Sequence, residues 1–362
     1  RPPRSTLFPY TTLFRSYGVV SGWVFGNDGY MGTAITKRGN KKLTWETTSE
    51  FNIGLDLGFF DNRISLSMEY YNRIISDLLV SNKSLPAYNE INTIAANIGK
   101  TQGRGFELTL STVNIMNKDW TWSTDFTFYT FKDNWYERDP NWKPAAYESK
   151  KDPIRSYYSY VSDGLLQVGE KAPAWQPTLV PGQIKLKNLY DTGTSPNVLD
   201  QYDKVNLGSQ DPKCTLGLNN TLRYKNLNFN IYFYGEIGRL RGASYYDAWI
   251  VGLGNSLTNV SQQSLHSYTN ANQNTTVPNL IESAYDFGDY YHKKINYLRC
   301  RNITLGYTIP VSKSIANSVR ISANVSNPFV FTNWNGVDPE TDTGNFSYPN
   351  VTSFSFGIDI SF

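Results

Sequence analysis

The feature that most constrains this chain is a period-two alternation of apolar and polar residues that recurs along most of its length. In the last segment, VTSFSFGIDISF, the residues Phe354, Phe356, Ile358 and Ile360 alternate with serine, glycine and aspartate. Successive side chains of a β-strand point to opposite sides, so this pattern is typical of a strand with one apolar and one polar face. We therefore predict such a strand at the C-terminal end of the chain.

Eight further segments carry the same kind of pattern, and a tenth strand is expected near residues 17–25. Several could run for about 12–16 residues, whereas strands of soluble sheets usually have about five or six. A tilted strand needs about 9–11 residues to cross the hydrocarbon of a bilayer, so long strands suit a membrane. The eight segments are EFNIGLDLGFF, RISLSMEYYNRI, GRGFELTL, DWTWSTDFTFYT, TLGLNNTLRY, NFNIYFYG, YLRCRNITLGYTIP and SVRISANVSN.

Composition agrees with a sheet protein and excludes some functions. The chain has 26 Tyr, 19 Phe and 9 Trp, together 15% of its residues, and aromatic residues favour strands. The net charge of +3 is too small to indicate nucleic-acid binding. No apolar segment approaches the roughly 18 residues of a transmembrane helix, but alternating strands of a membrane barrel have only mild mean hydropathy.

The connections between the predicted strands indicate which face is buried. Short links such as FFDNRIS and RYKNLNF alternate with long ones around residues 81–96, 134–213, 240–294 and 332–350. A soluble β-sandwich gives no reason for that order, whereas an outer-membrane barrel has short periplasmic turns and long external loops. We predict an all-β fold, a partial transmembrane antiparallel β-barrel of about nine or ten strands. A secreted carbohydrate-binding β-sandwich remains the alternative.

No catalytic or metal-binding constellation is found in the sequence. Cys214 and Cys300 are far apart, His266 and His292 are isolated, and no nucleophile, paired catalytic carboxylates or phosphate loop is recognisable. We therefore expect no enzyme activity, no metal and no cofactor.

The loop NLYDTGTSPNVLDQYDKV contains Asp191, Asp200 and Asp203 but lacks the spacing of a calcium loop. Six or more converging oxygens are needed for calcium, so we expect these three residues to be solvated loop carboxylates.

Five stretches of the chain resemble motifs of the SusC/RagA-like family of TonB-dependent outer-membrane transporters. They are LTWE at residues 43–46, NIGKTQGRGFE at 97–107, PGQIKLKNL at 181–189, YLRCRNITLGYTIP at 297–310, and VDPE at 337–340 with the closing strand YPNVTSFSFGIDISF. The departures from the family pattern are Gly103, Cys300 and Thr352. The resemblance covers nearly everything from residue 17 to residue 362.

The resemblance implies more than the strand pattern can show. It implies a 22-stranded barrel with an N-terminal plug, of which this chain would be the C-terminal part without the plug. It also implies import of oligosaccharides or oligopeptides through the outer membrane of a Gram-negative bacterium. The implied partners are a SusD-like surface lipoprotein, the TonB–ExbB–ExbD system acting through the upstream region, the barrel-assembly machinery and outer-membrane lipid. A siderophore-type receptor and a passive porin are the alternatives within the same architecture.

Residues 1–16 differ from the rest of the chain. The stretch TLFPYTTLFRS has no strand or helix period, and it resembles the conceptual translation of a sequencing adapter. It also lacks the layout of a signal peptide. We predict that residues 1–16 are not native and that the barrel portion comprises residues 17–362.

Tryptophans in the long links are the candidates for contact with a ligand. Aromatic faces stack on sugars and pack against partner proteins, although they also simply fold large loops. The candidates are Trp135, Trp142, Trp175 and Trp334. The terminal Phe362 is implied by the resemblance to be a signal for the barrel-assembly machinery.

Overall fold

The structure, a computed structural model, describes residues 16–25, 28–37, 39–85, 93–140, 143–190, 197–242, 262–279, 286–311, 317–336, 338–341 and 348–362. These residues fall into two compact units, one within residues 1–51, 72–103 and 133–143, the other of residues 52–71, 104–132 and 144–362. Among the described residues, no helix is both long and apolar enough to cross a membrane.

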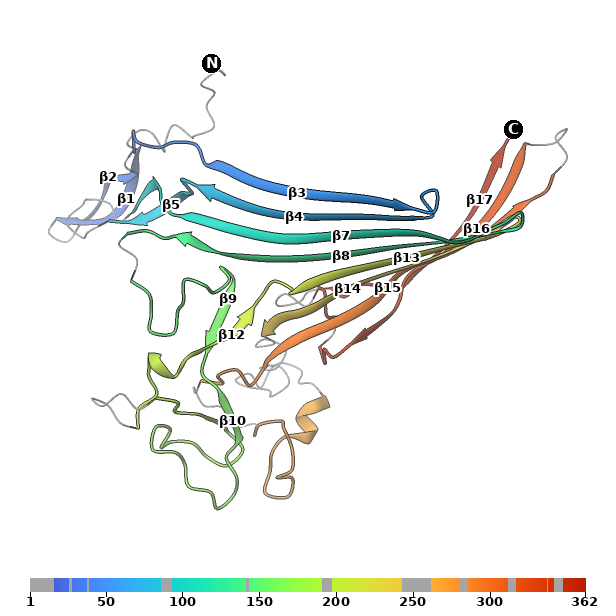
Figure 1. Ribbon diagram of the computed structural model, residues 1–362. Coiled ribbons are helices and arrows are strands. Elements are labelled where there is room, and N and C mark those ends of the chain that lie inside the picture. The colour runs from blue at the N-terminus through green and yellow to red at the C-terminus, as the bar shows by residue number, and fades with distance from the viewer. Residues whose placement is uncertain are drawn as a thin grey trace. The chain divides into compact units, whose positions relative to one another are not determined.

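Nine strands form one sheet in the order β17-β16-β15-β14-β13-β8-β7-β4-β3, which is the order of the chain (Figure 1). These nine are the segments predicted from the alternation, and they confirm the all-β, partial-barrel fold. Their bounds are β3 (Thr47–Phe59), β4 (Ile64–Ser76), β7 (Lys100–Met116), β8 (Trp120–Glu137), β13 (Cys214–Tyr224), β14 (Leu227–Gly242), β15 (His292–Ile309), β16 (Ser318–Thr332) and β17 (Ser353–Ser361).

Smaller pairs of strands and two short helices complete the described structure. Strands β1 (Ser16–Phe25) and β2 (Asp28–Lys37) pair with each other, as do β5 (Leu79–Ser84) and β6 (Thr93–Asn97). Strand β1 confirms the tenth strand expected near residues 17–25. In the long links, β9 (Ser156–Ser159) pairs with β12 (Val205–Ser209), and β10 (Ser162–Leu165) pairs with β11 (Ile184–Leu186). The helices are η1 (Gln201–Asp203) and η2 (Gln262–His266).

The strand register gathers the apolar residues on one face of the sheet. Phe356 pairs with Ala323, which pairs with Leu305, and Ile358 pairs with Ile321. Of these, Phe356 is 83% exposed, and Leu305 and Ile321 are also exposed. A soluble sheet buries its apolar face, whereas a membrane barrel presents it to lipid. A shift of the strand pairing by one residue would turn every side chain of that strand to the other side of the sheet. The observed register therefore determines which residues form the apolar face.

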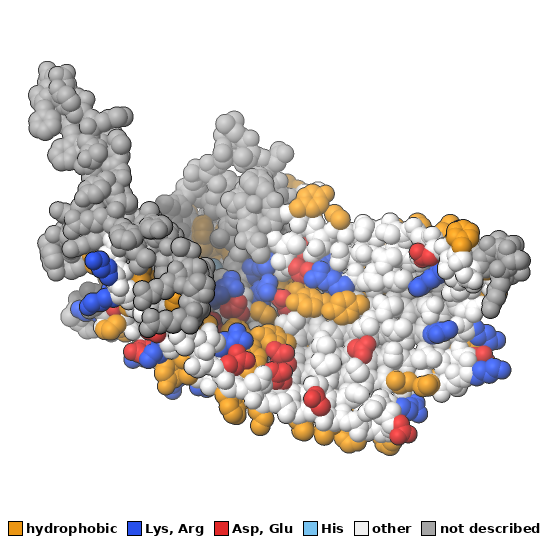
Figure 2. Space-filling model, turned by 90° about the horizontal axis from the view of Figure 1, so that it is seen from above, with side chains coloured by type: hydrophobic (Ala, Val, Ile, Leu, Met, Phe, Trp, Pro, Cys, Tyr) orange, Lys and Arg blue, Asp and Glu red, His pale blue; other side chains and the backbone are white. Residues whose placement is uncertain are grey.

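The opposite face of the sheet carries hydrogen-bonded polar side chains. The Asn302 amide donates to the Thr304 hydroxyl at 2.8 Å, and Asn324 on the next strand donates to the same hydroxyl at 2.8 Å. The Ser326 hydroxyl donates to Asn324 at 3.1 Å. One face of the molecule in Figure 2 is largely polar and uncharged, with single Lys, Arg, Asp and Glu side chains scattered over it. The in/out alternation that the sequence predicts is therefore present, with the apolar side outward.

Two of the motifs that resemble the family hold each other in place in the first unit. The Asn97 amide donates to the carbonyl of Thr44 at 2.9 Å, and its oxygen accepts the backbone N–H of Thr44 at 2.9 Å. Glu46 accepts the backbone N–H of Leu79 at 2.7 Å. In these two motifs, the side chains of Asn97 and Glu46 therefore bond to backbone groups that are not paired with a neighbouring strand.

The second part of the NIGKTQGRGFE motif contains a glycine, Gly105, under an aromatic ring. A Cβ added at Gly105 would lie 2.3 Å from the ring of Tyr71 on β4. The Tyr71 hydroxyl meets the hydroxyl of Tyr129 on β8 at 3.0 Å, and Tyr71 is buried. Only glycine leaves room for this ring, which ties three strands together on the polar face.

We expect Gly105→Ala to lower the free energy of unfolding of the full-length barrel by about 1–3 kcal/mol, the usual cost of overpacking. The added methyl group must displace the Tyr71 ring and lengthen its bond to Tyr129. Gly54→Ala is the matched control, since its added Cβ would make only an ordinary contact, 3.7 Å from the Met68 carbonyl oxygen. Denaturant unfolding in detergent measures both variants, and equal stabilities would contradict the interpretation.

The long links of the second unit fold into a module of their own, made of the described parts of residues 156–209 and 262–291. Its buried core consists of Leu165, Ile184, Leu186 and Tyr268. Asp289 accepts hydrogen bonds from the backbone N–H and hydroxyl of Ser162 at 2.7 and 2.6 Å, which joins the two links. The PGQIKL motif therefore supplies the core of this link module through its isoleucine and leucine.

One expectation for the link module is wrong. Asp203 is not solvated: it is 0% exposed. Its carboxylate accepts the backbone N–H groups of Leu189, Tyr190 and Asp200 at 2.6, 3.0 and 2.9 Å. A buried carboxylate is stable when several donors meet it, and here it closes the cap of η1. Asp191 lies outside the described residues.

Candidate functional site

The polar face of the sheet and the links at its end form the candidate functional surface. Midway along the sheet, the Ser111 hydroxyl donates to Asp125 at 2.7 Å. On the neighbouring strands, the Asn230 amide donates to Asn219 at 2.7 Å and to the Thr221 hydroxyl at 3.0 Å. Each of these side chains is partly exposed, so the surface can offer further donors and acceptors to water or to a polar solute.

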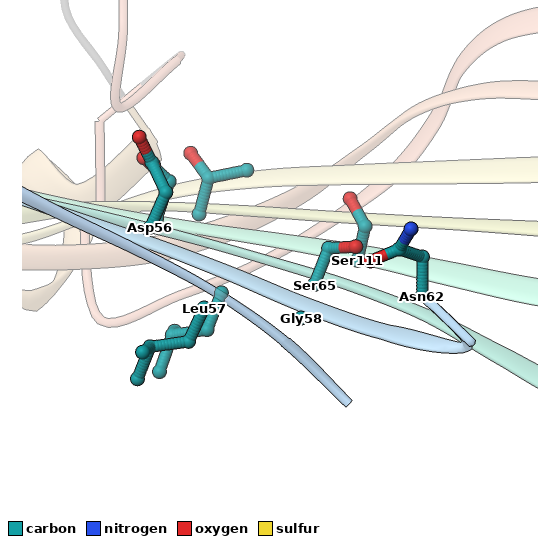
Figure 3. Close-up of a pocket in the computed structure, with 9 residues that line it drawn as sticks. Asp56, Leu57, Gly58, Asn62, Ser65 and Ser111 are labelled. Atoms are coloured by element: carbon teal, nitrogen blue, oxygen red, sulfur yellow. The ribbon is translucent and has the colours of Figure 1, made fainter. Parts of the chain in front are cut away.

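A hollow of about 290 Å³ opens on this face beside the turn between β3 and β4. Asp56, Asn62, Ser65 and Ser111 lie on one side of the strands in Figure 3, whereas Leu57 points to the other side. The remaining lining residues are Gly58, Leu66, Ser67 and Thr109. The lining is mainly small and polar, as the alternation of β3, β4 and β7 requires.

At the opposite end of the sheet lies a buried ion network between β15 and the link that follows β16. Arg299 donates through Nη2 to Asp338 and through Nε to Glu340, both at 2.8 Å. The side chains of Arg299 and Asp338 are each 4% exposed. Such a pair is stable only where its geometry is good and its other polar atoms are bonded. Two quoted motifs, YLRCR and VDPE, therefore meet in one cluster; Val337 lies outside the described residues.

Glu340 makes further contacts in this ion network besides the one with Arg299. Its other carboxylate oxygen accepts from Arg301 at 2.8 Å and from the Asn350 amide at 3.1 Å. The guanidinium of Arg241 on β14 donates to the Glu340 carbonyl at 3.2 Å. The Arg301 guanidinium also lies over the Tyr234 ring, 5.1 Å from its centroid. The network thus fastens both sides of the final link to β14 and β15.

Asp338 keeps its charge in spite of its burial. Burial by itself raises the pKa of this carboxyl, but three backbone N–H bonds and the Arg299 charge outweigh it and hold the pKa below its usual value. The donors are the N–H groups of Glu340, Asn350 and Thr341 at 2.8, 3.0 and 3.3 Å. The ionised form is therefore the form that orders the link.

We expect this link to loosen in acid. A carboxyl whose pKa is lower in the folded state adds stability that is complete above its unfolded value of about 3.9 and is lost as the pH falls through the lower folded pKa. Limited proteolysis between residues 338 and 350 of the full-length protein, as a function of pH, measures the loss. Asp338→Asn should be cleaved at neutral pH as well, and a wild-type link equally resistant at pH 2 would contradict the assignment.

The sequence-predicted tryptophans lie in different surroundings. Trp135 is in strand β8, because this strand extends to Glu137 beyond its predicted end, and the Arg138 guanidinium lies 5.4 Å from its ring centroid. Trp175 is half-buried in the link module, where its indole donates to the Leu186 carbonyl at 2.8 Å. Trp334 is buried with Ile295 and Tyr297.

Two other residues named from the sequence complete this set. Trp142 lies outside the described residues. Phe362 follows β17 and is 87% exposed. Trp175 bonds to Leu186 of the link module, whereas Trp334 packs in a different cluster with Ile295 and Tyr297, so the structure does not join the two tryptophans into one ligand site. Contact of any of the four tryptophans with a ligand stays a prediction.

The side chains of this surface are mainly hydrogen-bonding groups. In the described part of the chain, no three His, Cys, Asp or Glu side chains are grouped so as to hold a metal ion. The ionised side chains of the network are occupied with one another, and the polar face carries mainly amides and hydroxyls, with a few carboxylates such as Asp56 and Asp125. Such a surface suits weak, repeated hydrogen bonds to a hydrated solute.

Comparison with known protein families identifies the fold. Residues 2–327 match the family described as TonB dependent receptor-like, beta-barrel. The chain belongs to this family. TonB-dependent receptor P3 of Formosa agariphila is 29% identical, over 99% of this chain and 38% of the relative. TonB-dependent receptor SusC of Bacteroides thetaiotaomicron is 27% identical, over 98% of this chain and 36% of the relative.

Solved structures agree on the architecture. The RagAB peptide transporter superposes with a TM-score of 0.76 at 23% identity, over 97% of this chain and 39% of the other. This TonB-dependent receptor chain is thus of the SusC/RagA type and belongs to the outer membrane of a Gram-negative bacterium, as its motifs imply. It spans 36–39% of the length of these three proteins.

Sequence reasoning missed the ion network, although its signal is visible in hindsight. The strand YLRCR carries two arginines, and two acids follow in DPE after the next strand. A bulge between Cys300 and Asn302 interrupts the pairing of β15 with β16, beside Arg301. Strict alternation does not reveal such a bulge, so the arginines could not be assigned to a common site.

Proposed function

We propose that this chain is the C-terminal part of the barrel of a TonB-dependent importer of oligosaccharides or oligopeptides. A SusD-like surface lipoprotein would cover the long links, and the TonB–ExbB–ExbD system would energise uptake. The chain supplies barrel wall, polar inner surface and outer links, and it transports only as part of the full-length protein.

The observation that carries this proposal is the match to the TonB-dependent receptor barrel family, together with a sheet whose apolar face is exposed and whose other face is polar. A polar inner face keeps a hydrated solute in contact with hydrogen-bonding groups along a path through the bilayer. The folded link module, with its own core, gives a firm surface on which a partner protein could rest. The names of the relatives, two TonB-dependent receptors and a peptide transporter, support a role in import, and the family resemblance implies both oligosaccharides and oligopeptides as solutes.

Uptake by intact cells tests the proposal. The full-length gene would be deleted and restored, and uptake of fluorescent oligosaccharides and oligopeptides of graded length measured with and without an uncoupler. We expect restored uptake of one class, lost on uncoupling and on deletion of the gene for the SusD-like lipoprotein. Uptake that persists without energy indicates a porin, and uptake of iron chelates alone indicates a siderophore-type receptor.

Phe362 is proposed as the signal read by the barrel-assembly machinery. It is highly exposed at the end of β17, one of the two outer strands of the sheet. Phe362→Ala should reduce the amount of assembled protein several-fold at unchanged synthesis, measured by heat-modifiable migration of outer-membrane fractions. Phe354→Ala, on the same apolar face, is the control, and equal losses would reduce Phe362 to an ordinary lipid-facing residue.

A further inference from the structure

A group of polar side chains interrupts the outward apolar face of the sheet, near its short-turn end. Thr124 on β8 pairs with Asn220 on β13, between the pairs Trp122 with Leu222 and Phe126 with Leu218. Those pairs belong to the lipid-facing set, so Thr124 and Asn220 face lipid as well. Hydrogen-bonding groups in that position are costly unless they find partners.

The hydrogen bonds within this group fix which atoms are donors. The Asn220 oxygen accepts from the Trp122 indole N–H at 3.1 Å and from the Thr124 hydroxyl at 2.7 Å. An indole N–H can only donate, so the oxygen of Asn220 must point toward it and the amide nitrogen must point away. On β7, the Asn114 amide donates to the Thr124 hydroxyl at 2.8 Å.

The group therefore has surplus donors. Around it, the described structure offers the Asn220 side-chain N–H groups no protein acceptor, and Asn114 uses one of its two N–H groups. Both asparagines are at least partly exposed on the outward face. The complementary ligand is one that presents acceptors and no donors, as the ester carbonyls of a glycerophospholipid do.

The level of the group in the bilayer agrees with such a ligand. Trp120 and Tyr224 contact each other at the strand ends with ring centroids 4.2 Å apart, as an interfacial aromatic pair does. Asn220 and Thr124 are four residues farther along their strands, about 10 Å deeper for strands tilted by about 45°. At the level of the rings, the Lys225 ammonium lies 5.3 Å from the Tyr224 centroid. A cation thus lies at headgroup level, with amide donors below it.

We propose that Asn114, Thr124 and Asn220, with the Trp122 indole, form a site for one glycerophospholipid. Its ester carbonyls accept from the free amide N–H groups, its headgroup lies above them on the side of Lys225, and its chains cover Leu218 and Phe126. The leaflet is the one at the short turns, which the proposed orientation makes the periplasmic one. The proposal depends on the outer-membrane location and not on which solute is imported.

Lipid retention by the full-length receptor tests the site. The protein would be purified mildly and reconstituted in nanodiscs of phosphatidylethanolamine and phosphatidylglycerol, and retained phospholipid would be counted by native mass spectrometry after partial delipidation. Asn220→Leu should lose a phospholipid that Asn219→Leu retains, because Asn219 is on the same strand and faces the polar side. Lys225→Gln should weaken retention of phosphatidylglycerol without removing the site.

The other results are equally decisive. Equal retention by Asn220→Leu and Asn219→Leu would overturn the proposal. So would a change of oligomeric state in Asn220→Leu with unchanged lipid, which would make the group a protein–protein contact. If Asn220→Leu does not assemble, Thr124→Val is compared with Thr121→Val on the polar face, and the same difference in retention is required.

Discussion

Replacing Arg299 by methionine is expected to lower the free energy of unfolding of the full-length barrel by about 3–5 kcal/mol. The substitution leaves the carboxylates of Asp338 and Glu340, 4% and 11% exposed, without the guanidinium that both bind. Glu340 keeps its ion pair with Arg301, but Asp338 is left with backbone N–H donors alone, and a buried charge that loses its partner costs more than the lost attraction. Denaturant unfolding in detergent, with methionine-for-arginine changes elsewhere for comparison, provides the measurement.

The matched control is Arg155→Met, at an ion pair with the same 2.7–2.8 Å geometry but in solvent. Arg155 is 58% exposed and pairs with Asp211, so its removal should cost at most about 1 kcal/mol. If Arg299→Met were as mild as Arg155→Met, water would have to reach the network in the assembled protein. The buried link between YLRCR and DPE would then have no part in stability.

Introducing arginine at position 358 should cost about 2–4 kcal/mol if this position is near the bilayer midplane, and less toward an interface. Ile358 is 69% exposed beside Ile321, on the face that meets hydrocarbon, where an ionised side chain has no partner. The measurement is folded yield and urea unfolding of the full-length protein in liposomes.

Ser355→Arg is the control for this substitution on the same strand. Ser355 pairs with Asn324, which belongs to the hydrogen-bonded polar face, so a charge there remains hydrated. It is a cleaner control than Gly357, where an added Cβ would lie 2.9 Å from the Ser322 hydroxyl oxygen. Failure of Ser355→Arg to assemble, with normal assembly of Ile358→Arg, would reverse the assignment of the two faces.

The wall of the barrel was predictable from the sequence because lipid enforces a simple pattern. Each strand must present apolar side chains to hydrocarbon on every second residue, so long alternations such as that of β17 survive in the sequence. The end of β8 was predicted several residues too early. After Thr130 its side chains include Lys132, Asp133 and Asn134, and the two-residue period gives no signal there.

The links were not predictable in the same way. Strands as short as β10 and β11, with four and three residues, contain too few side chains for any period to be recognised. The burial of Asp203 depends on backbone N–H groups up to 14 residues away, and the bond of Arg299 to Asp338 joins positions 39 residues apart. Composition gives no account of such long-range partners, so solvated carboxylates were the natural but incorrect expectation for Asp203.

Strands β8 and β13 pair in unbroken register from Thr215 with Tyr129 to Tyr224 with Trp120, although the whole segment between Glu137 and Cys214 separates them in the chain. Each doubling of such a segment costs only about 0.6 kcal/mol in closure entropy. Natural selection can therefore lengthen, shorten or exchange such a link while the strands of the barrel wall stay unaltered. Descendants of one ancestral receptor can in this way acquire new links without a new barrel having to evolve.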